Sequence, residues 1–199
     1  MAATRTRTPS AAMEATLLGA ASDLLESEGP EALSIRRIAA TAGVAPMGVY
    51  NHFASKAGIV ESLFIQGFER LGEAMVTLGD IDDPYDALLE GGRRYRALAR
   101  AHPMAYRVMF LQAVPGFEPS QAALTAAAAA FDGLVASVGR AMRAGVLSDG
   151  DPALVAQMIW ASVHGWMTVE LAGMGFVDDS EAGGGSLCAA LLAGLAPRS

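Results

Sequence analysis

The sequence lacks most of the side chains from which metal centres and disulfide frameworks are built. It holds one cysteine, Cys188, and three scattered histidines among 199 residues. A single thiol excludes an internal disulfide, and no cluster has the spacing of metal ligands. A nucleophile elbow, a phosphate-binding glycine loop and an HExxH motif are also missing. We therefore expect no catalytic residue, no metal and no cofactor, and we interpret Cys188 as a small buried hydrophobic residue.

Targeting signals are lacking as well. The N-terminal stretch MAATRTRTPSAAMEA is basic, but no apolar segment and no cleavage pattern stand behind its arginines, so we expect a cytoplasmic protein. Residues 153–176 are long and apolar enough to span a membrane, yet Gln157, His164 and Glu170 lie inside this segment. A helix with two buried faces, one against its own core and one against a partner chain, gives the same composition. We favour that interpretation and expect no membrane partner.

Positive charge is scarce, and the formal net charge is −7. Up to residue 56 the basic and acidic residues balance; they are Arg5, Arg7, Arg36, Arg37 and Lys56 against Glu14, Asp23, Glu26, Glu28 and Glu31. The whole deficit therefore lies beyond residue 56, and any nucleic-acid contact must come from local placement of charge. Arg93, Arg96 and Arg100 recur at helical spacing, and we interpret them as a solvated face. The apolar content of 52% suggests an oligomer.

Helical spacing and helix punctuation recur along the chain, whereas alternating strand patterns are almost absent. We predict an all-α fold of about nine helices, with an N-terminal domain over residues 1–56 joined by a long helix to a C-terminal domain over residues 57–199. Ser34 and Ser55 are expected to cap the second and fourth helices, and Gly43 to turn the chain between the second and third. The later helices are predicted at 84–101, 104–111, 119–145, 152–174 and 187–195, and the glycine-rich stretch 180–186 is predicted to be a mobile loop.

Residues 39–58, AATAGVAPMGVYNHFASKAG, carry side chains that a packed core does not need. Two short helices joined by a glycine turn form a helix-turn-helix, whose second helix enters the major groove of DNA. Small residues from Ala45 to Gly48 let the backbone approach the bases. Lys56 opens a helix, where its charge opposes the macrodipole, which suggests an external anion. The alternative, that these side chains only cover a small helical core, explains neither the lysine nor the Pro-Met-Gly opening.

The segment LSIRRIAATAGVAPMGVYNHFASKAGIVESLF, residues 33–64, resembles the DNA-binding module of the TetR family (TetR/AcrR type) of bacterial transcriptional regulators. The shared pattern is a helix, an Ala-Gly-Val turn, Tyr-x-His-Phe and a Lys that begins the long connecting helix. This resemblance implies that Tyr50, His52 and Lys56 bind DNA phosphates and that Arg36 reaches a base. The other predicted DNA-binding residues are Ser34, Ala45, Pro46, Met47, Gly48 and Asn51.

The chain departs from the family pattern in two ways. Ala45 stands where a capping serine or threonine is usual, and the missing cap costs ~1 kcal/mol. Asn51 is the main candidate for a bidentate base contact, and Met47 can only touch thymine methyl groups. We therefore expect specificity to depend also on Arg36, on DNA shape and on a minor-groove arm around Arg5–Arg7, with a simple disordered tail as the alternative for that arm.

The second half of the chain resembles a TetR subgroup with a Trp-x-x-x-His-Gly signature, which Trp160, His164 and Gly165 match. The family resemblance implies that this domain dimerises and binds a small molecule. Aromatic and soft apolar side chains suit a small, mostly apolar ligand. The predicted ligand-binding residues are Tyr95, Met109, Phe110, Phe131, Met142, Trp160 and His164. Alternatively, these are ordinary core residues.

The last two helices are rich in small residues, and we predict that they pair with those of a second protomer. One short helix reads only a few base pairs, so a homodimer on a palindromic operator in double-stranded DNA is expected. Ligand entry would shift the long helix and release the DNA, as in a repressor. The alternatives are a ligand sensor whose DNA binding needs a co-regulator, and an enzyme that uses the C-terminal cavity.

Overall fold

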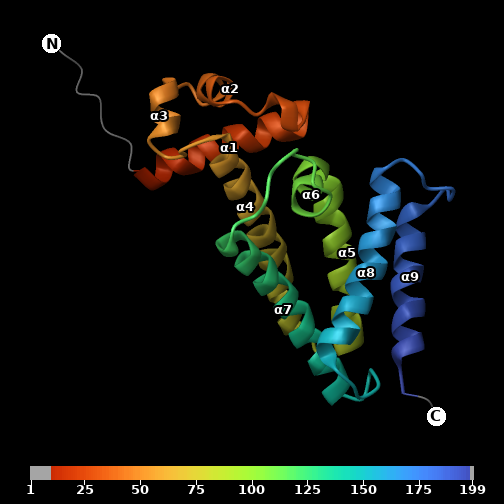
Figure 1. Ribbon diagram of the computed structural model, residues 1–199. Helices are drawn as coiled ribbons and strands as arrows, with labels where there is room; N and C mark the ends of the chain where they lie inside the picture. The colour runs from red at the N-terminus through yellow and green to blue at the C-terminus, as the bar shows by residue number, and fades with distance from the viewer. Residues whose placement is uncertain (1–9, 198–199) are drawn as a thin grey trace. The chain divides into compact units, whose positions relative to one another are not determined.

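The computed structural model describes residues 10–197, and every regular element within them is helical (Figure 1). The α-helices are α1 (Ser10–Glu28), α2 (Ile35–Thr41), α3 (Pro46–Tyr50), α4 (Lys56–Val76), α5 (Pro84–Ala101), α6 (Pro103–Phe110), α7 (Gln121–Arg143), α8 (Pro152–Leu171) and α9 (Ser180–Leu195). Two short 3₁₀ helices are η1 (Pro30–Ala32) and η2 (Thr77–Asp80). The predicted all-α fold is confirmed.

The chain divides into two compact units. Unit 1 comprises the residues up to Gly67 together with Met104–Ala123, and unit 2 comprises Phe68–Pro103 and the residues from Leu124 onward. Helix α4 runs for 21 residues from the first unit into the second. The helix begins at Lys56, so a boundary between residues 56 and 57 would fall within its first turn. The division of the chain into residues 1–56 and 57–199 stays a sequence-based prediction.

In unit 1 a cap and a glycine turn position α2. The Ser34 hydroxyl accepts a hydrogen bond from the Arg37 backbone N–H at 3.3 Å, as the sequence predicts. Gly43 has a φ of +68°, which lies in the left-handed region that glycine adopts without strain. The next residue then donates its N–H back to the helix, from Val44 to the Ala39 carbonyl at 2.9 Å. The chain is thereby turned into α3.

Helix α3 is only five residues long and depends on packing for its stability. Pro46 occupies its first turn, where a missing N–H costs nothing. Ala45 gives no side-chain cap, which confirms the prediction. Val49 is completely buried and Phe53 is 5% exposed, so these two side chains hold the helix against the rest of unit 1.

Unit 1 also contains α6, which a carboxylate of α1 caps. The two Glu26 oxygens accept hydrogen bonds from the backbone N–H groups of Met104, at 3.0 Å, and Ala105, at 2.8 Å. These N–H groups belong to the first turn of α6 and have no acceptor inside the helix. A Cβ at Gly67 of α4 would lie 2.5 Å from the Met109 sulfur, so glycine lets α4 and α6 approach each other.

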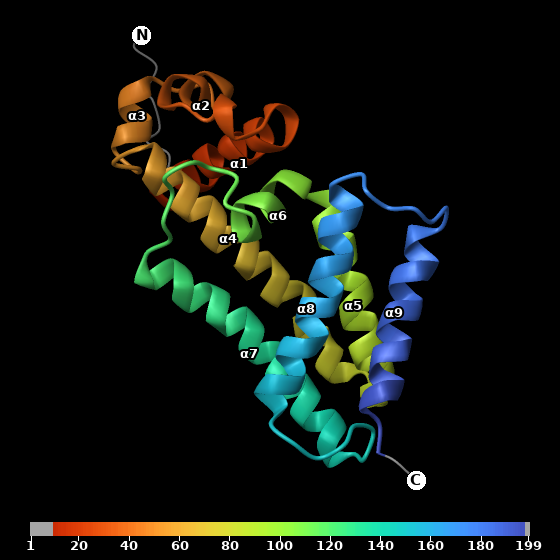
Figure 2. The same cartoon turned by 45° about the vertical axis from the view of Figure 1, so that its right-hand side comes forward.

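In unit 2, α5 packs against α8 and α9, and the last two helices lie side by side (Figures 1 and 2). Their core includes a cluster of buried apolar side chains from α5, α7, α8 and α9 and from the turn that follows α7. Its buried members are Leu88, Val138, Ala141, Met142, Leu147, Ala156, Ile159 and Leu192. Since the cluster joins four helices, the C-terminal pair is anchored to the rest of unit 2.

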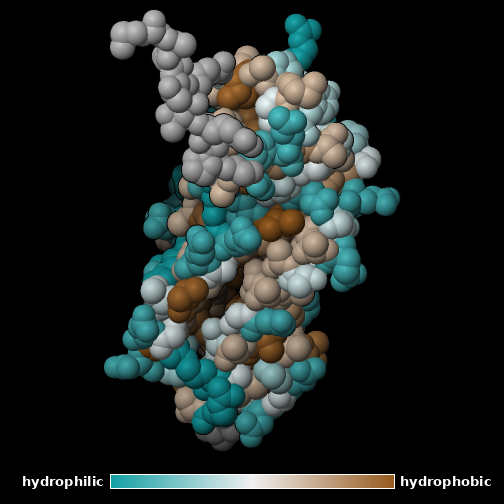
Figure 3. All heavy atoms as spheres, turned by 90° about the vertical axis from the view of Figure 1, so that its left-hand side faces the viewer, coloured by the Kyte–Doolittle hydropathy of each residue, from teal (hydrophilic) through white to brown (hydrophobic). Residues whose placement is uncertain are grey.

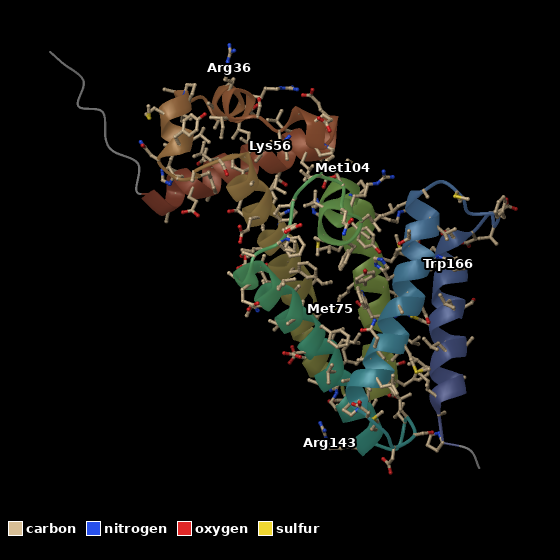
Figure 4. All side chains as sticks on the ribbon, in the orientation of Figure 1. Arg36, Lys56, Met75, Met104, Arg143 and Trp166 are labelled. Carbon is tan, nitrogen blue, oxygen red and sulfur yellow. The ribbon has the colours of Figure 1, made fainter. Side chains whose placement is uncertain are left out.

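The prediction of a mobile loop over residues 180–186 is wrong, because α9 begins at Ser180 rather than at residue 187. The Asp179 carboxylate caps the helix by accepting from Ala182 N–H at 2.9 Å. The indole of Trp166 packs against the glycines: a Cβ at Gly183 would lie 2.6 Å from Trp166 Cζ2, and one at Gly184 would lie 3.2 Å from Nε1. The glycines are therefore present for close packing between α8 and α9 (Figure 4).

Helix α7 begins at Gln121, two residues later than predicted, and ends at Arg143. Among the described residues it is the one helix long and apolar enough to span a membrane by length and composition. Core helices of soluble proteins can have the same length and composition. Figure 3 views the molecule from the side on which α7 lies and shows hydrophobic and hydrophilic residues interleaved.

Candidate nucleic-acid interface

The second helix of the helix-turn-helix presents an exposed row of side chains. Met47 is 68% exposed and Tyr50 is 53% exposed, whereas Val49 between them is buried. Asn51 follows at the end of the helix and is exposed as well. On the preceding helix, Arg36 extends away from the ribbon into solvent (Figure 4). This surface can reach the edges of bases and the phosphate backbone of a duplex.

All ten predicted DNA-binding residues lie in unit 1. The exposed members are Arg36, Ala45, Pro46, Met47, Tyr50 and Asn51, and the half-buried ones are Ser34, Gly48, His52 and Lys56. Gly48 has an ordinary backbone conformation, and a Cβ there would meet only Val44 at 3.7 Å, an ordinary contact. Packing therefore does not require a glycine at this position, which leaves room for the close approach of another molecule as the reason for it.

Lys56 has a partner within the protein. Its ammonium donates a hydrogen bond to the Pro30 carbonyl at 3.3 Å. The side chain also lines a cleft of about 310 Å³ together with Glu31, Ala57, Val60 and residues 114–117. The cation at the start of α4 is therefore compensated in part by a carbonyl of η1, a contact that the sequence pattern does not reveal.

In unit 2, four of the predicted ligand-binding residues lie together. Trp160 N–H donates to the Tyr95 hydroxyl at 3.3 Å, and this hydroxyl lies 3.0 Å from His164 Nδ1. The Trp160 ring lies 5.3 Å from the His164 ring and 6.3 Å from that of Phe131, edge-on. Burial lowers the pKa of His164, so the imidazole is neutral at pH 7. The group combines aromatic rings with three polar groups in hydrogen-bond contact, the Trp160 N–H, the Tyr95 hydroxyl and His164 Nδ1.

The other three predicted ligand-binding residues take no part in these ring and hydrogen-bond contacts. Met142 is a member of the buried cluster of unit 2, against which Phe131 also packs. Met109 and Phe110 belong to α6 in unit 1. There Met109 contacts Gly67 of α4, and the Phe110 ring lies 4.9 Å from that of Tyr106. The seven residues thus take part in at least three different local contacts.

Sequence reasoning missed an ion pair between α5 and α8. Arg96 donates to both Glu170 oxygens, at 3.1 and 2.9 Å, and the two side chains are only 12% and 15% exposed. Burial raises the pKa of Glu170, but hydrogen bonds from Arg96 and Ser180 and the charges of Arg96 and Arg100 outweigh it and lower the pKa. The interpretation of a solvated face is therefore wrong for Arg96, since its partner lies 74 residues away in the chain.

The described residues include no group of three or more histidine, cysteine, aspartate or glutamate side chains that could hold a metal ion. Cys188 is buried, and burial raises the pKa of its thiol. The proposed minor-groove arm around Arg5–Arg7 lies outside the described residues.

Two protein-family models match the sequence. The model described as "Bacterial regulatory proteins, tetR family" matches residues 17–63, and "Tetracyclin repressor-like, C-terminal domain" matches residues 88–193. The fold and the exposed recognition helix define a helix-turn-helix protein with a second helical domain. The chain belongs to the TetR family of bacterial transcriptional regulators. The assignment to the Trp-x-x-x-His-Gly subgroup stays a prediction.

An uncharacterized HTH-type transcriptional regulator of Mycobacterium tuberculosis is 26% identical over 152 residues, which cover 75% of this chain and 66% of the relative, just under two thirds. A protein of unknown function from Rhodococcus sp. RHA1 has a TM-score of 0.84 at 24% identity, with 99% of this chain and 100% of that chain covered. The TetR family regulator PfmR from Thermus thermophilus gives 0.69 at 21% identity, with 91% and 99% covered. These structural likenesses show the fold.

Proposed function

We propose that this protein is a DNA-binding transcriptional repressor that acts in the cytoplasm, associated with the nucleoid when bound. The observation that carries the proposal is the outward row of Met47, Tyr50 and Asn51 on a helix whose inward residue, Val49, is fully buried. Side chains without a role in packing stand where a recognition helix contacts a duplex. Membership of the TetR family supports the same function.

The recognition helix carries few groups that discriminate bases. Asn51 can make a bidentate contact with adenine, Arg36 with guanine, and Met47 can contact a thymine methyl group. Tyr50 and Lys56 offer a hydroxyl and an ammonium to phosphates. We therefore expect a short half-site, which a homodimer would read twice in a palindromic operator.

Exposed stripes on α8 and α9 support a homodimer through these helices. Leu154, Met158 and Val169 of α8 are 60%, 43% and 49% exposed, and Ala161 and Gly165 lie between them at helical spacing. The exposed face of α9 consists mainly of small residues, including Ala182, Gly185, Ser186, Ala190 and Ala193. Small side chains allow helices of two protomers to pack closely.

The dimer proposal has a direct test in Gly165. A Cβ there meets nothing within 4 Å, so a larger side chain fits the protomer but would obstruct a partner at this surface. Gly165→Leu should convert the dimer to a monomer in analytical ultracentrifugation. Gly133→Leu on α7, at another open and exposed position, is the matched control and should remain dimeric.

The second domain is proposed to bind a small, mostly apolar effector. The support is the contact between the Tyr95, Trp160 and His164 side chains, which provides polar groups among aromatic rings. A ligand that binds the DNA-incompetent form more tightly would release the operator. Because α4 is one unbroken helix that begins with Lys56, a shift along its axis would alter the presentation of the recognition helices.

Two other functions remain as alternatives. One is a ligand sensor whose DNA binding requires a co-regulator, and the other is an enzyme that uses the C-terminal cavity. Family membership favours a regulator over an enzyme.

The function is tested by selection of randomised duplex DNA with the purified protein at near-physiological salt. Enrichment of a palindrome would support a dimeric, sequence-specific regulator. If folded, dimeric protein enriches no sequence, the co-regulator alternative is favoured.

Four variants, measured on the selected site, then distinguish residues that bind phosphates from residues that recognise bases. Tyr50→Phe and Lys56→Ala should weaken binding to all sequences about equally, and Lys56→Ala should also lower its salt dependence because it removes a positive charge. Asn51→Ala and Arg36→Ala should instead reduce the discrimination between sequences, by about 1–3 kcal/mol for a bidentate contact. Equal loss of folded protein in all four would contradict the assignment.

A further inference from the structure

Two cations of the helix-turn-helix region are bound by one short segment, residues 28–30. The Arg37 guanidinium forms an ion pair with the Glu28 carboxylate, and the Lys56 ammonium donates to the Pro30 carbonyl at 3.3 Å. Within this segment Gly29 has a φ of +82° and donates its N–H to the Leu25 carbonyl at 2.9 Å, which turns the chain out of α1. The end of α1 thus presents two acceptors to the cations of α2 and α4.

Arg37 differs from its neighbour Arg36 in the direction of its side chain. Both lie in the first turn of α2 and both are exposed. Arg36 extends into solvent (Figure 4), whereas Arg37 turns back toward the end of α1 to reach Glu28. In a helix-turn-helix complex the first helix of the motif crosses the phosphate backbone, so an arginine of α2 lies near phosphates once DNA is bound.

The ion pair with Glu28 is one that DNA can replace. The side chains of Arg37 and Glu28 are 46% and 47% exposed, and exposed ion pairs contribute little to stability. A phosphate accepts the same bidentate hydrogen bonds from a guanidinium, and its neutralisation also releases counterions from the duplex. The exchange of a carboxylate for a phosphate therefore favours the complex.

We infer that Arg37 is a further phosphate-binding residue and that Glu28 is an internal competitor for it, which holds Arg37 in the free protein and weakens binding to any duplex. Lys56 likewise exchanges the Pro30 carbonyl for a phosphate when DNA binds, but the carbonyl is uncharged and competes less. The inference rests on the proposed DNA binding. It assigns a role to two residues outside the family-derived contact set, and it makes the end of α1 a determinant of affinity.

The test compares Glu28→Gln with Asp23→Asn. Both changes remove one exposed carboxylate from α1, but no ion pair of Asp23 is found among the described residues. Binding of a short fluorescent duplex of arbitrary sequence is measured by anisotropy at several salt concentrations. We expect Glu28→Gln to bind about three- to tenfold tighter at low salt than Asp23→Asn, with a salt slope steeper by about one unit. With this difference in slope, the ratio of the two affinities changes about threefold when the salt concentration rises fourfold.

Double variants test whether the gain in DNA affinity depends on Arg37. In the Glu28→Gln background, Arg37→Gln should abolish the gain, and Arg37→Lys should retain most of it because the charge is kept. Equal affinity and equal slope for Glu28→Gln and Asp23→Asn would overturn the inference, as would a gain that survives Arg37→Gln in protein with an unchanged melting temperature. Failure of the proposed function is distinguishable, because the wild type and every variant would then fail to bind duplex DNA in a salt-dependent manner.

Discussion

Unit 1 and unit 2 use polar side chains in opposite ways. In unit 1 the polar residues expected to contact DNA, such as Arg36, Tyr50 and Asn51, are exposed and contribute little to packing. In unit 2 the notable polar residues are partly or largely buried and paired with one another, as in Arg96 with Glu170 and Tyr95 with His164. The first arrangement leaves polar groups for a partner molecule, whereas the second uses them inside the protein.

Two glycines, one from each unit, show the same difference. Gly48 of α3 has room for a side chain, whereas a Cβ at Gly183 of α9 would collide with the indole of Trp166. Substitution of the exposed residues of unit 1 should therefore change DNA binding, whereas substitution of the packed residues of unit 2 should change stability.

The largest stability effect is expected for Arg96→Met. The substitution keeps an apolar stem but leaves the largely buried Glu170 carboxylate without its main partner, which should lower the free energy of unfolding by about 3 kcal/mol. Arg93→Met is the control, because its ion pair with Glu90 has an arginine 66% exposed and should contribute less than about 1 kcal/mol. Urea unfolding at a fixed protein concentration measures both. Equal losses would remove the distinction between surface and buried arginines.

Acid should break the same ion pair by protonation. The pKa of Glu170 in the folded protein is lowered below its unfolded value of about 4.3, so its contribution is present above that pH and is lost as pH falls through the folded pKa. The effect should be smaller than that of Arg96→Met, because a neutral carboxyl still accepts hydrogen bonds. Urea midpoints between neutral and acidic pH should fall more steeply for the wild type than for Glu170→Gln. Parallel curves would contradict the prediction.

Gly183→Ala should destabilise unit 2 by about 1–3 kcal/mol, because the new methyl group cannot fit against Trp166. Helix propensity alone favours alanine by up to about 1 kcal/mol, so the sign of the effect is informative. Gly133→Ala on α7, where the added Cβ meets nothing, should be stabilising and serves as the control. A rise in thermal stability for both variants would show that the contact with Trp166 imposes no constraint.

The smallest effect is expected in unit 1, for Ala45→Ser. A hydroxyl at this N-cap can accept from the first turn of α3 and should stabilise the protein by ~1 kcal/mol. Ala54→Ser, at an exposed position outside α3, should change nothing. Chemical denaturation measures the free energy of unfolding of both variants. If the two variants are equally stable, the packing of Val49 and Phe53 determines the stability of α3, and a cap adds nothing.

Unit 1 was predictable because its signals are local. Ser34 caps α2, the glycine turn has a left-handed φ, and Val49 and Phe53 face inward, as spacing and turn chemistry require. What the sequence did not indicate were contacts between distant segments. Glu26 caps α6 across 78 residues, and the carbonyl of Pro30 binds Lys56 across 26.

Unit 2 shows why such contacts cannot be read from a pattern. Three consecutive glycines, at 183–185, are typical of a loop, but here they form part of α9 because an aromatic ring from α8 packs against two of them. Arginines three and four residues apart indicate a helix face, but they do not indicate that Arg96 lies largely buried against an acid of α8. In both cases the neighbour that decides the outcome is far away in the chain.

The helical class, the helix-turn-helix and the family follow from the amino-acid sequence, because helix periodicity, caps and turn residues act within a few positions of the chain. Folding then establishes which polar groups are paired inside the protein and which remain on the surface. That distinction depends on burial and on the distance between segments that only folding brings together, and it separates Arg37, which Glu28 holds, from Arg36, which extends into solvent.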